Sequence, residues 1–435
     1  MYICGVLFFI LLFTEQGICR NADFHNNKVL STITFGSCNH HDDVQPLWSK
    51  IINQNPDLWI WLGDAVYADT RILPFIWVPS SLENMKDKYD QQKENYGYKE
   101  LLDRGTPVIG VWDDHDYGID GGGKEFKYRF QSQKIFLDFV DEPIDSIRRT
   151  RKGIYASYSY GTGNQIVKII LLDVRSHMVT GSSCDILGDE QWEWLENQLN
   201  DDAPELIFIG TGKQVLSDIP FIDKWMSCAS SLDRLIFLAQ KRSKVLFLSG
   251  DVHFSEVNCL NSSGTGYPLY EITSSGLTHS CSASLLPSGV CDWTLKNVVA
   301  SRYRVSNVVT DKNFGVIKID WESKPIKVTF HLVGENSILS SFSIVTDDLT
   351  LTRHPSSCPV AIEQPNWYWK RLFWCSVVLT VVLLCLFVLK ILDVIGRWIA
   401  LELLKDLDMK IKRRIKKLRL MVGAVYKKKN KEKTN

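Results

Sequence analysis

Five apolar runs of the chain each end in a cluster of residues that can bind cations or phosphate. Four of these clusters combine aspartate with histidine, tyrosine or arginine, and the fifth ends in cysteine; they occupy residues 63–67, 113–116, 173–175 and 250–253, and 36–38. In an open α/β sheet, ligands bind beyond the carboxyl ends of the strands, so residues in such positions meet at one edge. Turn formation alone does not explain five clusters of this kind. They predict a site of anionic ligands with a cationic group beside it.

The ligand types favour phosphoester cleavage at a centre of two different cations. Such a centre needs a bridging carboxylate, and Asp64 directly follows an apolar run. The Tyr67 phenolate and the Cys38 thiolate donate electron density strongly, which favours Fe³⁺. His253 would complete the iron sphere.

The second cation would be held by carboxylates. Asp64 would share it with Asp114 and Asp251. Ligands that are all oxygen favour Ca²⁺, with Mg²⁺ or Mn²⁺ as the alternative. His40 and His41 are interpreted as solvated loop residues rather than as ligands.

Short β-rich runs that alternate with helical patterns must position these residues, and this alternation is typical of an α/β fold. The predicted strands are residues 32–35, 58–62, 108–112, 167–172, 206–210, 245–248 and 270–273. An antiparallel hairpin is predicted for 316–319 and 326–332, around a turn at 322–325. The predicted helices are 44–53, 85–98, 133–140, 189–199 and 232–241.

Six ordered motifs make the chain resemble the PhoD-like alkaline phosphatases (alkaline phosphatase D) of the metallophosphatase superfamily. They read FGSC, PDLWIWLGDAVYAD, WDDHDYG, LLDVR, LGDEQWEWLENQL and VLFLSGDVHFSE, and the resemblance covers roughly residues 32–280. It implies a four-layer α/β fold with a central double β-sandwich flanked by helices. It also implies a centre of Fe³⁺ and Ca²⁺ and the hydrolysis of phosphomonoesters or phosphodiesters by a metal-bound hydroxide.

The resemblance assigns the metal ligands residue by residue. Cys38 stands where the superfamily usually has an Asp-x-His motif. Asp64 matches the bridging aspartate, and Tyr67 matches the tyrosinate ligand. Asp251 and His253 stand in for the final His-x-His pair.

The resemblance also assigns the groups that act on the substrate. Asp114 replaces the usual asparagine ligand, and His115 aligns with the histidine that protonates the leaving oxygen. Arg175 would bind a non-bridging phosphate oxygen, because its planar guanidinium matches phosphate geometry. Asp113 and Asp116 are interpreted as positioning or capping groups.

Two apolar runs predict the membrane topology. Residues 1–19 are typical of a secretory signal peptide, and residues 372–392 are typical of a transmembrane helix. From Lys390 onward the chain carries 15 basic and 5 acidic side chains. The positive-inside rule therefore places the tail, 393–435, in the cytoplasm and the catalytic domain, 20–350, with a stalk at 351–371, in the lumen as a type I protein.

Seven cysteines lie in the predicted luminal part and stalk. If Cys38 is a metal ligand, the other six can form three disulfides in any of 15 connectivities. Disulfides fit an oxidising compartment. The sequence Asn261-Ser262-Ser263 predicts N-glycosylation.

The basic tail carries two further signals. An apolar stripe from Ala400 to Val422, interleaved with lysine and arginine, predicts a helix on an anionic membrane surface, with a coiled-coil partner surface as the alternative. Lys431 and Lys433 resemble a dilysine signal that would bind coat-type retrieval machinery. This favours the endoplasmic reticulum membrane over the plasma membrane or another secretory compartment. The acidic remainder of the chain argues against nucleic-acid binding.

The combined prediction is a single-pass, membrane-anchored, luminal, metal-dependent phosphatase or phosphodiesterase. Membrane tethering suggests a lipid-linked phosphoester substrate, selected by the loops at 70–79 and 258–268, which match no motif. A non-catalytic scaffold is the alternative from another class, disfavoured because the ligand set and His115 are complete. A zinc or purple-type acid phosphatase is the alternative for the metal pair, and Cys38 argues against it.

Overall fold

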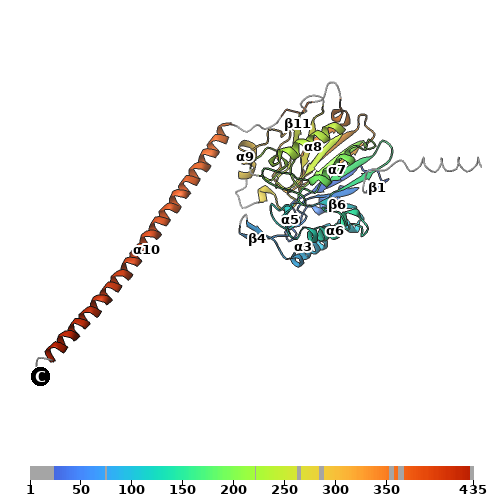
Figure 1. Cartoon of the computed structure of the whole chain (residues 1–435). Coiled ribbons are helices and arrows are strands. Elements are labelled where there is room, and N and C mark those ends of the chain that lie inside the picture. Colours follow the sequence, from blue (N-terminus) through green and yellow to red (C-terminus); the bar gives the residue numbers. More distant parts are fainter. Residues whose placement is uncertain are drawn as a thin grey trace, which may run out of the picture. The chain divides into compact units, whose positions relative to one another are not determined.

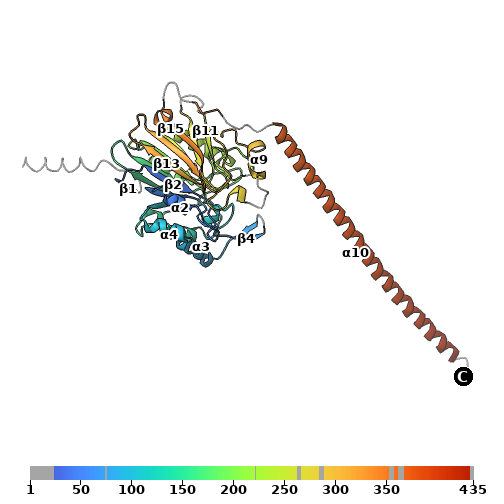
Figure 2. The same cartoon turned by 180° about the vertical axis from the view of Figure 1, so that it is seen from behind.

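Two β-sheets pack face to face at the centre of the globular part of the chain (Figures 1 and 2). The computed structural model describes residues 24–73, 76–220, 222–261, 266–283, 289–351, 357–360 and 367–431. They belong to two units, one ending at Asn366 and one beginning at Trp367. One hydrophobic core joins the sheets, as in the contact of Phe208 with Phe330, whose ring centroids are 6.4 Å apart.

The first sheet has seven strands in the order β1-β7-β8-β9-β10-β12-β11. Neighbours β8, β9, β10 and β12 are parallel, whereas β7 and β11 pair antiparallel with β8 and β12. The bounds are β1 Phe24–Asn26, β7 Ala156–Tyr160, β8 Val167–Leu171, β9 Leu206–Thr211, β10 Val245–Ser249, β11 Glu256–Leu260 and β12 Leu269–Thr273.

The second sheet has six strands in the order β15-β14-β13-β2-β3-β6. Strands β2, β3 and β6 are parallel, and β13 and β14 form the predicted antiparallel hairpin. A separate two-stranded sheet pairs β4 with β5. The bounds are β2 Thr32–Gly36, β3 Leu58–Leu62, β4 Thr70–Leu73, β5 Ile76–Val78, β6 Val108–Val111, β13 Phe314–Asp320, β14 Lys327–Val333 and β15 Ile338–Val345.

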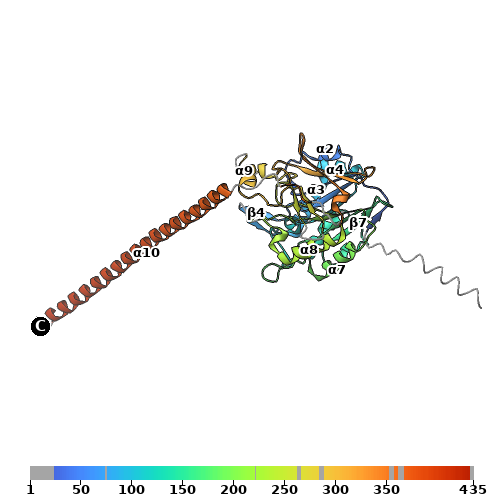
Figure 3. The ribbon, with the colours of Figure 1, turned by 90° about the horizontal axis from the view of Figure 1, so that it is seen from above.

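Helices cover the outer faces of both sheets (Figure 3), which confirms the predicted four layers. Helix α7 packs on the first sheet, where Lys168 Nζ donates to the Gln198 carbonyl oxygen, and α2 packs on the second through Trp48 and Trp59. The bounds in this unit are α2 Trp48–Ile52, α3 Leu82–Glu94, α4 Tyr96–Asp103, α5 Asp114–Tyr117, α6 Arg129–Phe139, α7 Gly188–Leu199, α8 Ala229–Arg242 and α9 Val290–Asn297. Short 3₁₀ helices lie at Ile147–Arg149, Trp225–Ser227, Cys281–Ala283 and Thr346–Leu349.

The helix predicted over residues 85–98 is two helices in the structure. Asn95 leaves the helical conformation with ψ 127°, and its side chain accepts hydrogen bonds from the backbone N–H groups of Gly97 and Tyr98. Asparagine caps helices well because its side chain replaces the missing backbone acceptor. The sequence also did not predict several elements that the structure contains: strands β1, β4, β5, β7, β11 and β15 and helices α5 and α9.

Three disulfides are present, Cys184–Cys228, Cys259–Cys358 and Cys281–Cys291. Cys38 is a free, buried thiol. The structure therefore confirms that the six other cysteines of the described globular unit can pair among themselves, and it selects one connectivity of the 15.

The second unit is one helix, α10, from Trp367 to Lys431. Its segment Trp367–Gly423 is long and apolar enough to cross a membrane by length and composition. The helix continues through the predicted transmembrane segment and into the predicted tail without a break. The predicted signal peptide, part of the stalk and residues 432–435 lie outside the described residues.

One buried carboxyl group in the first sheet makes stability depend on pH. Glu271 of β12 is fully buried and accepts hydrogen bonds from the backbone N–H groups of Val215 and Leu216 at 2.6 and 2.7 Å. Burial raises its pKa from 4.5 to about 7. Between these values the folded state holds the proton more tightly than the unfolded state, so the stability falls as pH rises.

We expect Glu271→Gln to remove this pH dependence, which for the native carboxyl is on the order of 3 kcal/mol between pH 4.5 and 7. Urea unfolding of the full chain in detergent at pH 5 and pH 7.5 would measure the change in the free energy of unfolding. Parallel stability curves for the variant and the native chain would contradict the expectation.

Candidate metal centre and active site

The five predicted clusters meet at one end of the two sheets. Strands β2, β3 and β6 lead into the loops of Cys38, Asp64 and Asp114, and strands β8 and β10 lead into those of Arg175 and Asp251. Parallel strands within each sheet send their carboxyl ends to the same edge. Face-to-face packing then brings the edges of the two sheets together, so residues far apart in the chain share one site.

The sheets approach so closely at this edge that a glycine is required. A Cβ atom on Gly250 would lie 2.4 Å from the Leu62 carbonyl oxygen and 2.4 Å from Ser37 Oγ. No side chain fits at such distances. Gly250 therefore allows the loop after β10 to approach the loops after β2 and β3.

Aspartates form the centre of the site. Asp64, Asp114 and His115 each offer a ligand atom, and these atoms lie within 4.8 Å of one another. Asp113, Asp114 and Asp251 form a second such group. Because Asp114 belongs to both groups, the two are adjacent, as a pair of neighbouring cations requires.

The predicted sulfur and phenol donors lie beside these aspartates. Cys38 Sγ is 3.7 Å from Oδ2 of Asp64 and 3.0 Å from Oγ of Ser275. The hydroxyl oxygen of Tyr67 is 3.1 Å from Nε2 of His253. The fold thus brings together the four side chains that the sequence assigned to the iron sphere.

Four of the predicted ligands have strained backbones. Cys38, Asp64, Asp251 and His253 have φ values of 57°, 48°, 73° and 60°, and they make up half of the eight non-glycine residues with positive φ in the described part of the chain. Each such conformation costs on the order of 1–3 kcal/mol, and such residues cluster at functional sites. The strained residues are therefore concentrated among the predicted ligands, as expected of a functional site that holds its side chains in a fixed geometry at a cost in local stability.

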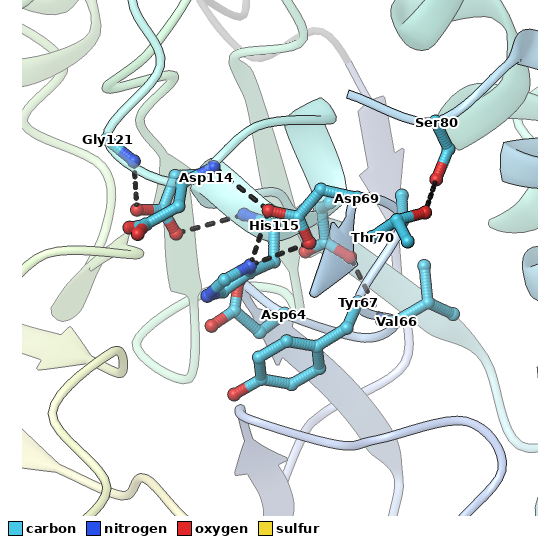
Figure 4. A network of polar contacts seen from close by, with 12 residues as sticks. Asp64, Val66, Tyr67, Asp69, Thr70, Ser80, Asp114, His115 and Gly121 are labelled. Atoms are coloured by element: carbon cyan, nitrogen blue, oxygen red, sulfur yellow. Dashed lines mark hydrogen bonds and ion pairs between the residues drawn. The ribbon is translucent and has the colours of Figure 1, made fainter. Parts of the chain in front are cut away.

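His115 lies among three aspartates (Figure 4). Its Nδ1 atom is 2.9 Å from Oδ1 of Asp69, and its ring is grouped with Asp64 and Asp114. Burial by itself would lower the pKa of His115, but the carboxylates of Asp114, Asp69 and Asp64 outweigh burial and raise the pKa to about 10. The neighbouring carboxylates thus favour the protonated imidazole, which is the form that a general acid requires.

Arg175 is fully buried and pairs with three carboxylates. Its guanidinium lies 2.5 Å from Asp113, 3.5 Å from Asp114 and 3.0 Å from Asp223, and Lys213 also pairs with Asp223 at 2.8 Å. Despite these short distances, the two terminal nitrogens of Arg175 have no hydrogen bond of good geometry among the described residues. The guanidinium thus holds the aspartates in place and retains capacity to donate hydrogen bonds to a ligand.

The acidic groups of the site have too little positive charge around them. Burial raises the pKa of Asp64 and of Asp251 well above the usual range, and it does the same for Cys38 and Tyr67. Oδ1 of Asp64 and Oδ2 of Asp113 are buried without a hydrogen-bond donor among the described residues. Bound cations would favour the ionised forms of all these groups, so the donor set fits a metal centre.

Asp116 positions the loop that follows β3. Its carboxylate accepts hydrogen bonds from the backbone N–H groups of Ala65 and Val66 at 3.1 and 3.0 Å. Asp113 contributes to the site through its ion pair with Arg175. Both aspartates therefore make the kind of positioning contact that was expected of them.

The sequence analysis did not assign a role to Asp69 or Asp223. Asp69 closes the motif that contains Asp64, so the motif itself was the available signal. Asp223 lies in the segment between β9 and α8 and follows no strand directly. Only the tertiary fold reveals that it pairs with Arg175.

Aromatic rings surround the acid and the phenol. The centroid of Trp77 is 4.6 Å from that of His115, and the His279 ring stacks on His253 at 4.2 Å. His40 stacks on Tyr67 at 4.9 Å. The sequence predicted that His40 and His41 are solvated loop residues. This is wrong for His41, which is only 8% exposed because the loop after β2 folds back over the site.

We expect the full chain purified in detergent to retain about two metal ions, as a dinuclear site requires. Cys38→Ser and Tyr67→Phe should each lower the metal content, and any visible charge-transfer band should weaken. Elemental mass spectrometry and absorption spectra would measure both. Cys375→Ser, at an exposed free cysteine of α10, is the matched control. A folded native chain that takes up neither iron nor calcium would contradict the expectation.

Comparison with known proteins identifies the family. The family model of the PhoD-like phosphatases matches residues 33–330. Comparison with curated proteins finds no match. A solved structure of PhoD is similar in fold, with 15% identity, a TM-score of 0.55 and coverage of 80% of this chain and 76% of that chain.

Two other solved structures are more distant. The first, described as GAP50, the anchor in the inner membrane complex of Plasmodium, has 12% identity, a TM-score of 0.47 and coverage of 73% of this chain and 90% of that one. The second, TT1561 of Thermus thermophilus, has 6% identity, a TM-score of 0.32 and coverage of 57% and 91%. The family model spans most of the globular unit. This chain belongs to the PhoD-like phosphatase family.

Proposed function

We propose that the protein is a membrane-anchored, metal-dependent phosphatase or phosphodiesterase. The observation that carries the proposal is the position of His115, a buried imidazole whose Nδ1 lies 2.9 Å from Asp69 Oδ1, beside a cluster of carboxylate, thiol and phenol side chains. A phosphoester needs cations for its negative oxygens and an acid for its leaving group. The site offers ligands for the first and His115 for the second.

Two groups of residues would hold the cations. Cys38, Tyr67 and His253 would hold Fe³⁺ together with Asp64, which would bridge to the second ion. Asp64, Asp114 and Asp251 would hold Ca²⁺, or Mg²⁺ or Mn²⁺. When bound, the cations would supply Lewis-acid stabilisation of the phosphoryl group and a lowered pKa for the attacking water.

The chain's own residues would orient the substrate and move the proton. Asp69 holds Nδ1 of His115, which leaves Nε2 to donate a proton to the leaving oxygen. The terminal nitrogens of Arg175 would bind a non-bridging phosphate oxygen. This contact would compete with Asp223, whose side chain is 36% exposed and is the most accessible of the arginine's three partners.

We also propose where the protein is located in the cell. A long apolar C-terminal helix fits a membrane anchor, and three disulfides fit a secretory lumen. We assign the catalytic unit to the luminal side of a type I protein, with the basic tail in the cytoplasm. The dilysine-like end of the tail supports retrieval to the endoplasmic reticulum by coat-type machinery. Imaging of the tagged full chain with Lys431→Ser/Lys433→Ser would test the retrieval signal.

Tethering to a membrane supports a lipid-linked phosphoester as the substrate. A membrane anchor keeps the catalytic unit near lipid headgroups and far from most soluble esters. Release of a headgroup from labelled phospholipid by the full chain would test this, and activity confined to soluble esters would overturn it.

His115→Gln should reduce kcat by about 10²- to 10⁴-fold on alkyl phosphoesters, whose leaving group needs a proton. The loss should be smaller on p-nitrophenyl esters, because p-nitrophenolate leaves without protonation. Steady-state kinetics of the full chain on both ester types would measure the difference. His177→Gln, outside the metal-ligand groups, is the control. Equal losses on the two substrates would argue against a general-acid role.

Asp69→Asn should shift the alkaline limb of the pH–rate profile to lower pH. Asp69 helps to raise the pKa of His115 to about 10, so removing its charge lets the acid lose its proton earlier as pH rises. Activity should therefore fall at a lower pH than in the native chain. Profiles of kcat on an alkyl ester, with the exposed Asp145→Asn as control, would record the shift. A uniform drop in kcat without a shift would indicate a merely structural role for Asp69.

A further inference from the structure

The β4–β5 hairpin presents apolar side chains to solvent beside the candidate active site. Among the described residues, its strands pair only with each other, in a two-stranded sheet separate from the two large sheets. Ile72, Leu73 and Ile76 are 55%, 58% and 47% exposed. Isolated exposed apolar residues are ordinary, but three of them on one short hairpin, with Leu73 paired to Ile76, are typical of an interaction surface.

The base of the hairpin is part of the site. Thr70 follows Asp69, the partner of His115, and its hydroxyl is 2.7 Å from that of Ser80 at the other end of the hairpin (Figure 4). Trp77 packs against His115 and lies 5.7 Å from Tyr67 between ring centroids. Asp69 and Trp77 therefore connect the exposed apolar residues of the hairpin to His115.

A second exposed apolar group lies at the same edge of the globular unit. Figures 1, 2 and 3 all place α9 and β4 toward the same side of this unit. On α9, Val290 and Trp293 are 40% and 41% exposed and stand three residues apart, on one face of the helix. Tryptophan is enriched where protein meets the membrane interface.

The chain confines this unit to the neighbourhood of a bilayer. The Cys259–Cys358 disulfide and the hydrogen bond from the Cys358 N–H to Asn261 Oδ1, at 2.7 Å, tie the end of the globular unit to β11. Trp367, the first residue of the candidate membrane helix, comes nine positions after Cys358. Fully extended, that stretch spans at most about 30 Å.

We propose that the β4–β5 hairpin inserts Ile72, Leu73 and Ile76 into a phospholipid bilayer and thereby presents lipid phosphoesters to the site. This rests on the proposed function and narrows its substrate to esters embedded in a membrane. Apolar elements of interfacial proteins enter about 5–10 Å below the headgroups. Two strand residues span about 7 Å, so Thr70 and Asp69 would then lie at the level of the lipid phosphates.

Charge at the hairpin is consistent with a lipid surface. Arg71 is exposed and lies over the ring of Trp77, 5.8 Å from its centroid. A cation beside apolar side chains suits a surface whose acyl region lies under anionic headgroups. A bilayer is also the partner that the anchor keeps within reach at all times.

Contact of the hairpin with lipid can be measured by fluorescence quenching, which does not depend on enzyme activity. The full chain would carry Ile76→Cys labelled with bimane. Cys375→Ala and Cys385→Ala would remove the exposed free thiols of the described residues, and Cys4→Ala and Cys19→Ala would remove those of the predicted signal peptide. The labelled chain would be reconstituted into vesicles of phosphatidylcholine and phosphatidylserine with nitroxide-bearing acyl chains. We expect an intensity about twofold lower than in vesicles without nitroxide, because the probe lies within the acyl boundary. A probe at Ile144→Cys, 88% exposed near the amino end of β6, should not be quenched.

The contribution to lipid hydrolysis can be separated from catalysis. We expect Ile72→Ser/Leu73→Ser/Ile76→Ser to lower hydrolysis of vesicle phospholipid by about tenfold, or 1.4 kcal/mol. Hydrolysis of a soluble p-nitrophenyl phosphodiester should stay within about twofold of the native rate, which also shows that the variant is folded. Ile144→Ser/Ile147→Ser/Phe237→Ser removes three exposed apolar side chains elsewhere and should leave both activities unchanged.

The outcomes distinguish the two proposals. An unquenched Ile76 probe would overturn hairpin insertion, and if cross-linking through Ile76→Cys then joined two chains, the surface would be assigned to a second copy. Equal loss of lipid and soluble activity in the hairpin variant would also overturn it. If the native chain cleaved no phosphoester while the probe was quenched, the proposed function would fail and the membrane contact would stand.

Discussion

The site depends on the enclosure of many acidic groups at one edge of two packed sheets. Asp114 lies close to Asp64 in one group and to Asp113 and Asp251 in another, beside a thiol and a phenol, and all of these aspartates except the half-buried Asp251 are buried. Buried carboxylates are stable only when positive charge or donors surround them. Arg175 and His115 supply part of that charge, and the remaining deficit is what makes the cluster suited to metal ions.

The scaffold tolerates local strain to reach this arrangement. Four of the predicted ligands on the loops after β2, β3 and β10 adopt left-handed backbones, and Gly250 admits a contact that any side chain would block. The broad apolar core of the two sheets and their helices stabilises the loops that carry this strain. Strained loops on a rigid sheet edge commonly hold ligands in backbone conformations that are unfavourable for the isolated segment.

Asp69, the partner of the acid His115, and the apolar hairpin belong to one continuous segment. Asp69 orients His115, the next residue begins β4, and Trp77 of β5 returns to pack on His115. Movement or insertion of the hairpin would therefore be transmitted to the proton donor through two contacts. With α10 as a membrane anchor, as we propose, the short tether from Cys358 would hold the site near lipid headgroups.

The sequence by itself determined the elements and the chemical types. Apolar runs located the parallel strands, because buried strands are continuously hydrophobic, and the polar clusters after them identified Cys38, Asp64 and Asp114 as neighbours. The count of cysteines also left six for disulfides. The inner strand β7 and the edge strand β15 escaped prediction because their small and polar residues resemble those of loops. The pairing of disulfides, the contact of Asp69 with His115, the ion pairs of Arg175 with Asp223 and the position of Trp77 were decided only by the tertiary structure. Such contacts join residues from separate loops, and their geometry depends on the packing of the whole sheet edge rather than on any local pattern.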